Sequence, residues 1–235
     1  MAQPRQVVQL LTRGAVTIRG RMPWASNATF LAEVALDADR ALAVYKPERG
    51  ERPLWDFPRG LFKREIAAYH LSETLGWGLV PLTVPRQEAP YGEGSLQLFV
   101  DADFEQHYFT LLERPEHRAR LMGICAFDLV ANNADRKGGH CLLGPDERIY
   151  AIDNGLTFHV EPKLRTVIWD FGGEPIPREI LDGIHRLMDA DLPESLIELL
   201  EPDERQALLA RGRGLARRGR FPKDASGMRY PWPLL

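Results

Sequence analysis

The feature that most constrains this chain is a polar loop followed, after a short interval, by an apolar run that ends in an aspartate. The loop reads NNADRKGGH over residues 132–140, and the run IYAI over residues 149–152 leads into Asp153 and an Asn-Gly pair. Asp135 and Asp153 are 153 − 135 = 18 residues apart. A loop, a strand, a turn and a second strand fit in that interval, since Asn-Gly is a strong turn signal. Both carboxylates can therefore face one cleft.

The two aspartates match the layout of a kinase catalytic loop and its metal-binding aspartate. In kinases one Asp handles the acceptor hydroxyl and the other holds Mg²⁺. The alternative is structural, because loop aspartates also cap helices or close turns, and an Asn-Gly hairpin needs no function. Other segments of the chain bear on the choice.

The apolar pattern divides the chain into a β-rich first part and a helical second part. Strand-like runs are AVTIRG, ATFLAEVAL and ALAVYK within residues 15–46, and SLQLFV at 95–100. Helical patterns, with apolar residues at i, i+3 and i+4, are expected over residues 61–75, a stretch running to Asn132, and 178–189, 194–201 and 203–219. Asp101-Ala102-Asp103 breaks the chain between the two parts. We therefore expect an α+β, two-lobed protein-kinase-like fold, with a small β-rich N-lobe (1–100) and a helical C-lobe (101–235).

Composition limits the partners and the compartment. A net charge of −3 argues against a general binder of nucleic acid or of anionic membranes. We see no signal peptide and no apolar run of membrane-spanning length, and Cys125 and Cys141 lie among apolar neighbours, as reduced core residues do. A cytoplasmic protein without stable membrane insertion is expected. The basic cluster from Arg211 to Arg220 is interpreted as a solvated helix face.

Lys46 ends the apolar run Leu42–Tyr45 and is followed by proline. An ammonium group at the end of a buried strand needs a partner. Glu65, which is 65 − 46 = 19 residues later on the helix expected over 61–75, can supply the opposite charge. In kinases such a pair directs the Lys onto the α- and β-phosphates of ATP. Two surface charges at the edge of a lobe are the alternative.

Four segments in this order resemble the phosphatidylinositol 3-/4-kinase-like family, especially its type II 4-kinases and compact bacterial members. They are AVYKPERGE at 43–51, GSLQLFVD at 94–101, NNADRKGGHCLL at 132–143 and AIDNGLTFH at 151–159. The resemblance covers roughly residues 15–172. It implies ATP and a divalent cation, Mg²⁺ or Mn²⁺, as cofactors.

The resemblance also assigns nucleotide-binding roles. Lys46 corresponds to the phosphate-binding lysine and Glu65 to its ion-pair partner. Phe99 and Val100 fall where the adenine-binding hinge is expected, with backbone groups making the contacts. Leu142 and Ile152 complete the expected nucleotide-binding residues, with Ser26 and Asn27 as candidates for capping the phosphates. An ordinary polar turn is an equal alternative for Ser26 and Asn27, because this loop lacks the glycines of a P-loop.

In the catalytic loop, Asp135 corresponds to the catalytic aspartate, Lys137 to the lysine that binds the γ-phosphate in protein kinases, and Asp153 to the metal-binding aspartate. The family has Asn as its second metal ligand, five residues after the catalytic Asp, where this chain has His140. An imidazole suits Mn²⁺ better than Mg²⁺. Either His140 is a ligand that changes the metal preference, or the role is lost and the kinase is weak or inactive. We expect a preference for Mn²⁺ and activity that falls as His140 protonates below about pH 6.

Two further residues in this region are interpreted as structural. Arg136 is expected to place its guanidinium on carboxylates or carbonyls. Asp170-Phe171-Gly172 spells the DFG triplet of protein kinases, but it lies 170 − 135 = 35 residues after Asp135, almost twice the usual interval. The metal is therefore assigned to Asp153.

These patterns favour an ATP-dependent phosphotransferase acting on a hydroxyl group. The acceptor is not specified: a protein Ser/Thr hydroxyl, including the chain's own, an inositol lipid and a small alcohol all stay open, because fold analogy does not transfer substrate. The alternatives are a nucleotide-binding pseudokinase that acts as an interaction module, and a lipid or inositol kinase.

Overall fold

The computed structural model describes residues 4–23 and 27–235. The chain divides into two compact units, of which the first comprises Met1–Ile66 and Pro81–Val100 and the second Ala67–Val80 and Asp101–Leu235. Helix α2 (Leu61–Thr74) contributes its first six residues to the first unit and the rest to the second. Ala67, Leu71 and Leu75 belong to the apolar core of the second unit, which explains why 67–80 is grouped with it.

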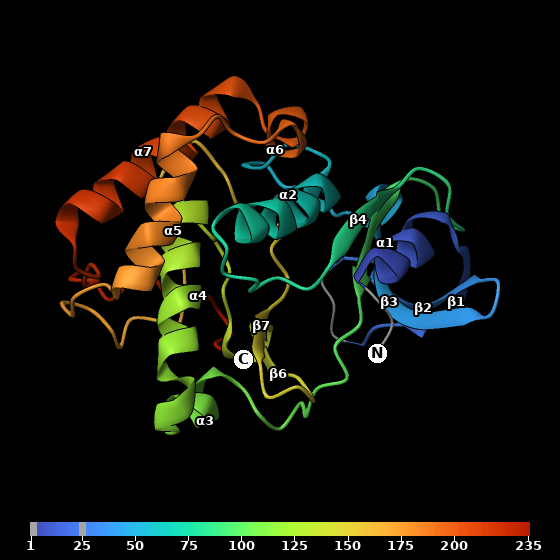
Figure 1. The fold of residues 1–235 in the computed structure, drawn as a ribbon, viewed down its shortest axis with the longest axis horizontal. Helices are drawn as coiled ribbons and strands as arrows, with labels where there is room; N and C mark the ends of the chain where they lie inside the picture. The colour runs from blue at the N-terminus through green and yellow to red at the C-terminus, as the bar shows by residue number, and fades with distance from the viewer. Residues whose placement is uncertain (1–3, 24–26) are drawn as a thin grey trace. The chain divides into compact units, whose positions relative to one another are not determined.

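The first unit is built on a five-stranded antiparallel sheet in the order β1-β2-β3-β5-β4 (Figure 1). Its strands are β1 (Ala15–Arg21), β2 (Phe30–Leu36), β3 (Asp39–Pro47), β4 (Thr83–Arg86) and β5 (Gly94–Leu98). Helix α1 (Pro4–Arg13) packs on β2, β3 and β4, and a short 3₁₀ turn, η1 (Glu48–Gly50), follows β3. The core between helix and sheet is formed by Leu10, Leu11, Ala32, Val34, Ala43, Tyr45, Val84 and Leu96.

Alternation of side chains explains the sheet. Ala32 and Val34 on β2 and Ala43 and Tyr45 on β3 are buried, with less buried residues between them, as expected for strands with one face on a core. The register pairs Ala32 with Ala43 and Val34 with Ala41. This arrangement places Lys46, the next residue after Tyr45, at the end of a central strand.

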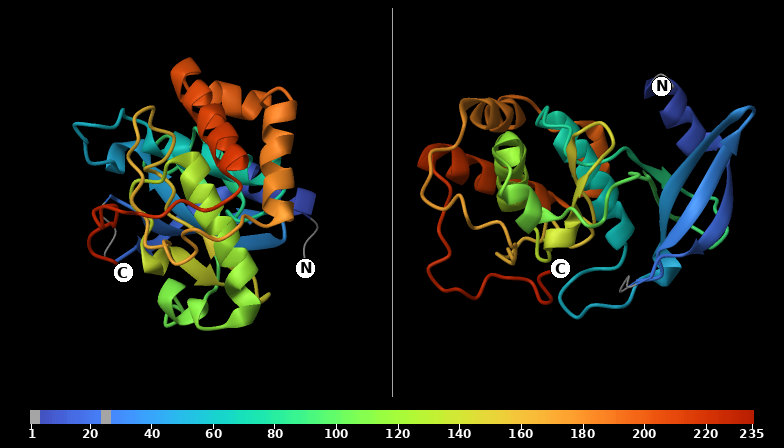
Figure 2. Two further views of the ribbon diagram at one scale, coloured as in Figure 1. Left: turned by 90° about the vertical axis from the view of Figure 1, so that its left-hand side faces the viewer. Right: turned by 90° about the horizontal axis from the view of Figure 1, so that it is seen from below.

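The second unit is mainly helical (Figures 1 and 2). Its elements are α3 (Tyr108–Leu112), η2 (Pro115–His117), α4 (Arg118–Ala131), η3 (Gly138–His140), β6 (Cys141–Leu143), β7 (Ile149–Ala151), α5 (Arg178–Asp189), α6 (Glu194–Leu199) and α7 (Pro202–Arg218). Helix α4 is buried from Leu121 onward except for the half-buried Leu129, and α7 packs on both α4 and α5. Cys125 and Cys141 are buried and unpaired, as expected. The strands predicted between Asp135 and Asp153 are β6 and β7, which form an antiparallel pair.

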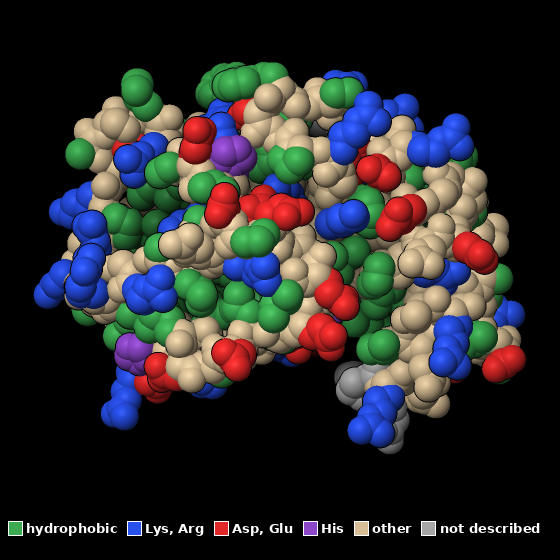
Figure 3. Space-filling view, turned by 90° about the horizontal axis from the view of Figure 1, so that it is seen from above, with side chains coloured by type: hydrophobic (Ala, Val, Ile, Leu, Met, Phe, Trp, Pro, Cys, Tyr) green, Lys and Arg blue, Asp and Glu red, His purple; other side chains and the backbone are tan. Residues whose placement is uncertain are grey.

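The basic cluster on α7 and just after it differs in one respect from the predicted solvated face. Arg213, Arg217 and Arg218 are exposed, and Figure 3 shows Lys and Arg side chains gathered where Figure 1 draws the C-terminal end of α7. Arg211 instead points inward, where it donates hydrogen bonds to the carbonyls of Val130 (2.8 Å) and His159 (3.2 Å). Burial lowers the pKa of Arg211 to about 10. This arginine is therefore structural.

None of the helices in the described part of the chain is both long and apolar enough to cross a membrane.

Candidate functional site

The loop that carries Asp135 starts where α4 ends, at Asn132. Asn132 adopts a left-handed backbone (φ 57°), which Asn tolerates better than most residues. Its side-chain amide donates to the carbonyls of His159 (2.9 Å) and Glu161 (2.7 Å), and its oxygen accepts from the Lys163 amide (2.9 Å). The change of direction from helix to loop is thus fixed by bonds to a later segment of the chain.

Arg136 is the anchor of this loop, and it is fully buried. Its Nε donates to both carboxylate oxygens of Asp128 on α4 (3.1 Å each). Its two terminal nitrogens donate to the carbonyl of Ile152 (2.5 Å) and the side-chain oxygen of Asn154 (2.6 Å). Burial alone would lower the pKa of Arg136, but the adjacent Asp128 carboxylate raises it, so the guanidinium stays charged.

These contacts fix the spacing of the two aspartates. Arg136 follows Asp135 directly, and its guanidinium contacts the residues on both sides of Asp153. One buried side chain therefore links the loop of Asp135 to the residues that flank Asp153. The sequence-based interpretation of Arg136 as a structural contact to carboxylates and carbonyls agrees with this geometry.

Asp135 and Lys137 form an ion pair on the more exposed side of the same loop. The Asp135 amide donates to the side-chain oxygen of Asn133 (2.9 Å), which holds the turn. Burial raises the pKa of the Asp135 carboxyl, the Lys137 ammonium lowers it, and the charge of Asp153 raises it further. Asp153 is thus close enough to Asp135 to interact with it electrostatically.

His140 and Asp153 face each other across the β6–β7 hairpin. Nε2 of His140 is 3.4 Å from Oδ2 of Asp153, and the His140 carbonyl accepts from the Ile152 amide (3.0 Å). The Asp153 side chain is 51% exposed, and its backbone is left-handed (φ 56°). Asp tolerates this conformation better than most non-glycine residues do.

Among the residues that the structure describes, no three His, Cys, Asp or Glu side chains are arranged to hold a metal ion. The pair His140 and Asp153 still fits a divalent ion bound with a nucleotide, because Mg²⁺ sites commonly use one or two protein ligands with waters and substrate phosphates. Nδ1 of His140 accepts a long bond (3.3 Å) from the Lys137 amide, which leaves the proton of a neutral ring on Nε2. Binding of an ion at Nε2 therefore requires that this long bond is given up.

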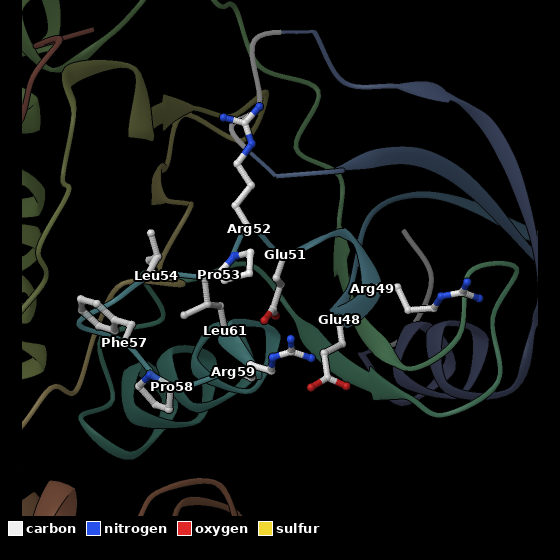
Figure 4. Close-up of a pocket in the computed structure, with 10 residues that line it drawn as sticks. All are labelled: Glu48, Arg49, Glu51, Arg52, Pro53, Leu54, Phe57, Pro58, Arg59 and Leu61. Carbon is white, nitrogen blue, oxygen red and sulfur yellow. The ribbon is translucent and has the colours of Figure 1, made fainter.

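In the first unit, Lys46 and Glu65 form the predicted ion pair. The side chain of Glu65 is only 3% exposed, so its charge is compensated chiefly by its partners in the protein. Glu51 fixes the start of α2, the helix that carries Glu65, by accepting hydrogen bonds from the amides of Gly60 (3.0 Å) and Phe62 (2.8 Å). Glu51 also lines a cavity of about 290 Å³, and the residues that line it all belong to this unit (Figure 4).

The remaining predicted nucleotide-binding residues belong to different loops and strands. Ser26 lies outside the described residues. The side-chain oxygen of Asn27 accepts a bond from the Arg52 amide (2.9 Å), which ties its loop to the chain after β3. The Phe99 amide donates to the Leu42 carbonyl (3.0 Å), and Val100 is the next residue. Leu142 is a buried residue of β6, and Ile152 follows β7.

The DFG triplet has a structural environment. Oδ2 of Asp170 accepts a hydrogen bond from the hydroxyl of Tyr108 on α3 (2.6 Å), and Phe171 is part of the core of the second unit. Burial and this bond to Asp170 raise the pKa of Tyr108, so its hydroxyl remains a donor.

Asp128 and Glu51 are two supporting residues that sequence reasoning missed. The sequence does indicate a structural role for Asp128. It is a charged residue within the apolar stripe of the helix running to Asn132, and such a group needs a buried partner. Glu51 lies in the AVYKPERGE motif but ten residues before the helix that it caps, so no local capping pattern indicates it.

Comparisons with known proteins agree with this architecture. The structure resembles the Golgi casein kinase with Mn/ADP bound (TM-score 0.58, 16% identity, covering 100% of this chain and 81% of that one). It also resembles hydra Fam20 with sugar (TM-score 0.58, 15% identity, 91% and 87% covered). The expected α+β kinase-like fold is therefore confirmed.

No family model matches the sequence. The chain is 40% identical to Protein Rv2133c of Mycobacterium tuberculosis (strain ATCC 25618 / H37Rv), and the alignment covers 95% of this chain and 94% of that protein. At this identity and coverage, the chain belongs to the same protein family as Protein Rv2133c.

Proposed function

We propose that the protein is an ATP-dependent phosphotransferase that transfers the γ-phosphoryl group to a hydroxyl. One observation carries the proposal: Arg136 links the loop of Asp135 to both neighbours of Asp153, and the two carboxylates interact electrostatically. Phosphoryl transfer depends on such fixed positioning and on charge stabilisation rather than on covalent chemistry by the protein. The kinase-like fold supports the same conclusion.

Each residue then has a defined task. Asp135 orients the acceptor hydroxyl and takes its proton as the hydroxyl oxygen bonds to the γ-phosphorus and ADP leaves. Lys137 exchanges its contact with Asp135 for one with the transferred phosphoryl group. Lys46, oriented by Glu65, binds phosphate oxygens of ATP. Asp153 and His140 would hold a divalent ion, Mg²⁺ or Mn²⁺, whose charge offsets that of the phosphates.

The type of kinase and the acceptor belong to the proposal as well. The four sequence motifs support a phosphatidylinositol 3-/4-kinase-like enzyme. A protein hydroxyl is the first candidate acceptor, and an inositol lipid or a small alcohol are the others. The Golgi casein kinase in the comparison binds Mn/ADP, which supports Mn²⁺ and a nucleotide as ligands here.

The second candidate function is a nucleotide-binding module without transfer activity. The bond from the Lys137 amide to Nδ1 of His140 favours it, because the resulting tautomer presents a proton, not a lone pair, toward Asp153.

The deciding experiment incubates the purified chain with γ-labelled ATP and either Mn²⁺ or Mg²⁺, and compares wild type with Asp135→Ala. Asp135-dependent transfer of label to protein, lipid or water supports the phosphotransferase. Nucleotide binding without any transfer supports the module. A matched pair, Asp153→Asn and Asp170→Asn, tests the metal assignment: metal-dependent ATP binding should be lost only in the first.

A further inference from the structure

Residues 224–235, here called the tail, follow a course along the second unit and end beside the loop that carries Asp135 (Figure 2). The tail begins with a local turn, in which the Asp224 carboxylate accepts bonds from the amides of Ser226 (3.0 Å) and Arg229 (3.1 Å). From the Arg229 carbonyl onward, the hydrogen-bond partners of the tail backbone belong to other segments. No task in the proposed reaction requires it.

At its first contact the tail binds the segment that follows Asp153. The carbonyl of Arg229 accepts hydrogen bonds from the Thr166 amide (3.0 Å) and from the indole nitrogen of Trp169 (3.2 Å). That segment is in turn paired with the loop of Asp135, because Arg136 and Thr166 form a parallel bridge. The Arg136 amide donates to the Arg165 carbonyl (3.0 Å), and the Val167 amide donates to the Arg136 carbonyl (3.1 Å).

At its second contact the tail reaches the loop itself. The carbonyl of Leu234 accepts a hydrogen bond from the Gly138 amide (2.7 Å), three residues after Asp135. A Cβ atom at position 138 would lie 2.8 Å from the Leu235 side chain and 2.9 Å from the Phe109 ring. Glycine at position 138 therefore leaves room for the end of the tail.

The tail is held by few apolar contacts. Pro231 is buried and Leu234 packs against the core, whereas Trp232 is 86% exposed and Met228 is 80% exposed. The donors that the tail satisfies are two backbone amides and one indole, and all three bind backbone carbonyls of the tail and not its side chains. Between these contacts the tail bends at Trp232 and Pro233, so its backbone is not a regular strand. Main-chain hydrogen bonds of this kind give a peptide affinity without selecting particular side chains.

We propose that the edge formed by Gly138, Thr166 and Trp169 is a docking surface for the backbone of a polypeptide segment, and that the tail occupies it in cis. The polypeptide is the acceptor substrate, since the edge includes the loop that carries Asp135. This inference rests on the proposed phosphotransferase function and narrows the acceptor class to protein. Release of the tail would open the surface to an acceptor in trans.

The first test measures docking without any catalysis. The full-length Leu234→Asp variant places a charge at the packed position of the tail, and Trp232→Asp places the same charge at an exposed one. A fluorescent synthetic peptide, DASGMRYPWPLL (residues 224–235), is titrated against wild type and both variants by anisotropy. We expect at least tenfold tighter binding to Leu234→Asp than to wild type, with Trp232→Asp behaving as wild type. Equal affinity for all three proteins, or no binding to any, overturns the docking surface.

A second route avoids a variant that fails to fold. A protease recognition sequence inserted between Ser226 and Gly227, in the exposed turn, is cut after folding. The cut protein should exchange its own tail for the labelled peptide, and a peptide carrying Asp at the position of Leu234 should not compete. Failure to exchange, in protein whose near-ultraviolet circular dichroism is unchanged, contradicts a displaceable tail.

The third measurement connects docking to transfer. With dephosphorylated casein as the probe acceptor, tail release should raise phosphate transfer several-fold and lower KM for casein, while ATP turnover without acceptor stays constant. A fall in both activities would mean that the tail supports the loop, and would overturn the proposal. If no protein transfers phosphate to any acceptor but the peptide still docks, the proposed function fails and the docking surface stands.

Discussion

Neighbouring residues of one loop have opposite surroundings. Arg136 is fully buried and its hydrogen bonds go to a carboxylate, a carbonyl and a side-chain amide oxygen. Asp135 and Lys137, on either side of it, are partly exposed and pair with each other. A buried, satisfied network is costly to rearrange, whereas an ion pair near water exchanges partners cheaply. The loop thus combines a rigid inner half, which sets the geometry, with an outer half that can respond to a substrate.

The largest expected effect is the loss of phosphate transfer after a substitution in the outer half of the loop. Asp135→Asn removes the proposed base, and we expect phosphate transfer to fall by about 10²–10⁴-fold. The free energy of unfolding should change by less than about 1 kcal/mol, because the ion pair of the carboxylate with Lys137 is partly exposed to water. Labelled-ATP assays and urea titrations measure the two quantities. Asp170→Asn is the matched control, and an equal loss of transfer in that variant would contradict the division.

A substitution at the inner half of the loop should instead lower the stability of the protein. Asp128→Ala leaves the Arg136 guanidinium buried without its counter-charge, which should lower the free energy of unfolding by about 3–5 kcal/mol. Activity should be lost only to the extent that the protein unfolds or the loop shifts. Replacing both partners, as in Asp128→Leu with Arg136→Met, removes the unpaired charge and should recover only part of this loss, because Ile152 and Asn154 still lose their hydrogen-bond donor. A single Asp128→Ala variant as stable as wild type in urea would show that the inner half is not the anchor.

A smaller effect is expected at the ion pair of the first unit. Glu65→Gln removes the charge that orients Lys46, and a charge-assisted hydrogen bond contributes about 1.5–3 kcal/mol, so kcat/KM for ATP should fall roughly 10- to 100-fold. Glu33, which pairs with Arg19 on the exposed side of the same sheet, provides the control. Glu33→Gln should leave kcat/KM unchanged, and equal losses in both variants would mean that charge in general, not Lys46, is responsible.

The smallest effect concerns the protonation of Asp135. Its pKa lies above the ordinary value of a carboxyl, so the basic form is lost as the pH falls through this raised pKa, at a higher pH than for an exposed aspartate. Lys137 lowers the pKa and Asp153 raises it. Lys137→Met should therefore move the titration to higher pH and Asp153→Asn to lower pH, as followed by NMR of ¹³C-labelled aspartate side chains. Shifts in the same direction would contradict the arrangement.

Local patterns predicted most of the elements. The apolar runs ATFLAEVAL and ALAVYK predicted β2 and β3, and the apolar stripe predicted the helix that ends at Asn132, which is α4. Helix α1 was not predicted, although Val7, Leu10 and Leu11 recur at i, i+3 and i+4 and could have indicated it. Strand β4 was missed because it is four residues long and contains Pro85, and proline disfavours a strand assignment.

The candidate site divides in the same way. The order of motifs predicted Lys46, Asp135 and Asp153 as site residues, because each lies in a short motif, and these assignments stay predictions. The hydrogen bond between Arg136 and Asp128 could not be predicted from the sequence, because it depends on how the loop folds back on α4. The course of the tail was not readable either, because its bonds to Gly138 and Thr166 join backbone atoms, which carry no sequence signal.

Arg136 donates hydrogen bonds to Ile152 and Asn154 and not to Asp153 itself, which has an evolutionary consequence. The backbone around Asp153 is held without help from its carboxylate. If the proposed function holds, a mutation at Asp153 or His140 should therefore change ion binding or abolish transfer while the fold survives. Relatives of this chain could then change between an enzyme and a binding protein by single substitutions. A change at Arg136, by contrast, should be removed by selection on folding before any selection on catalysis acts.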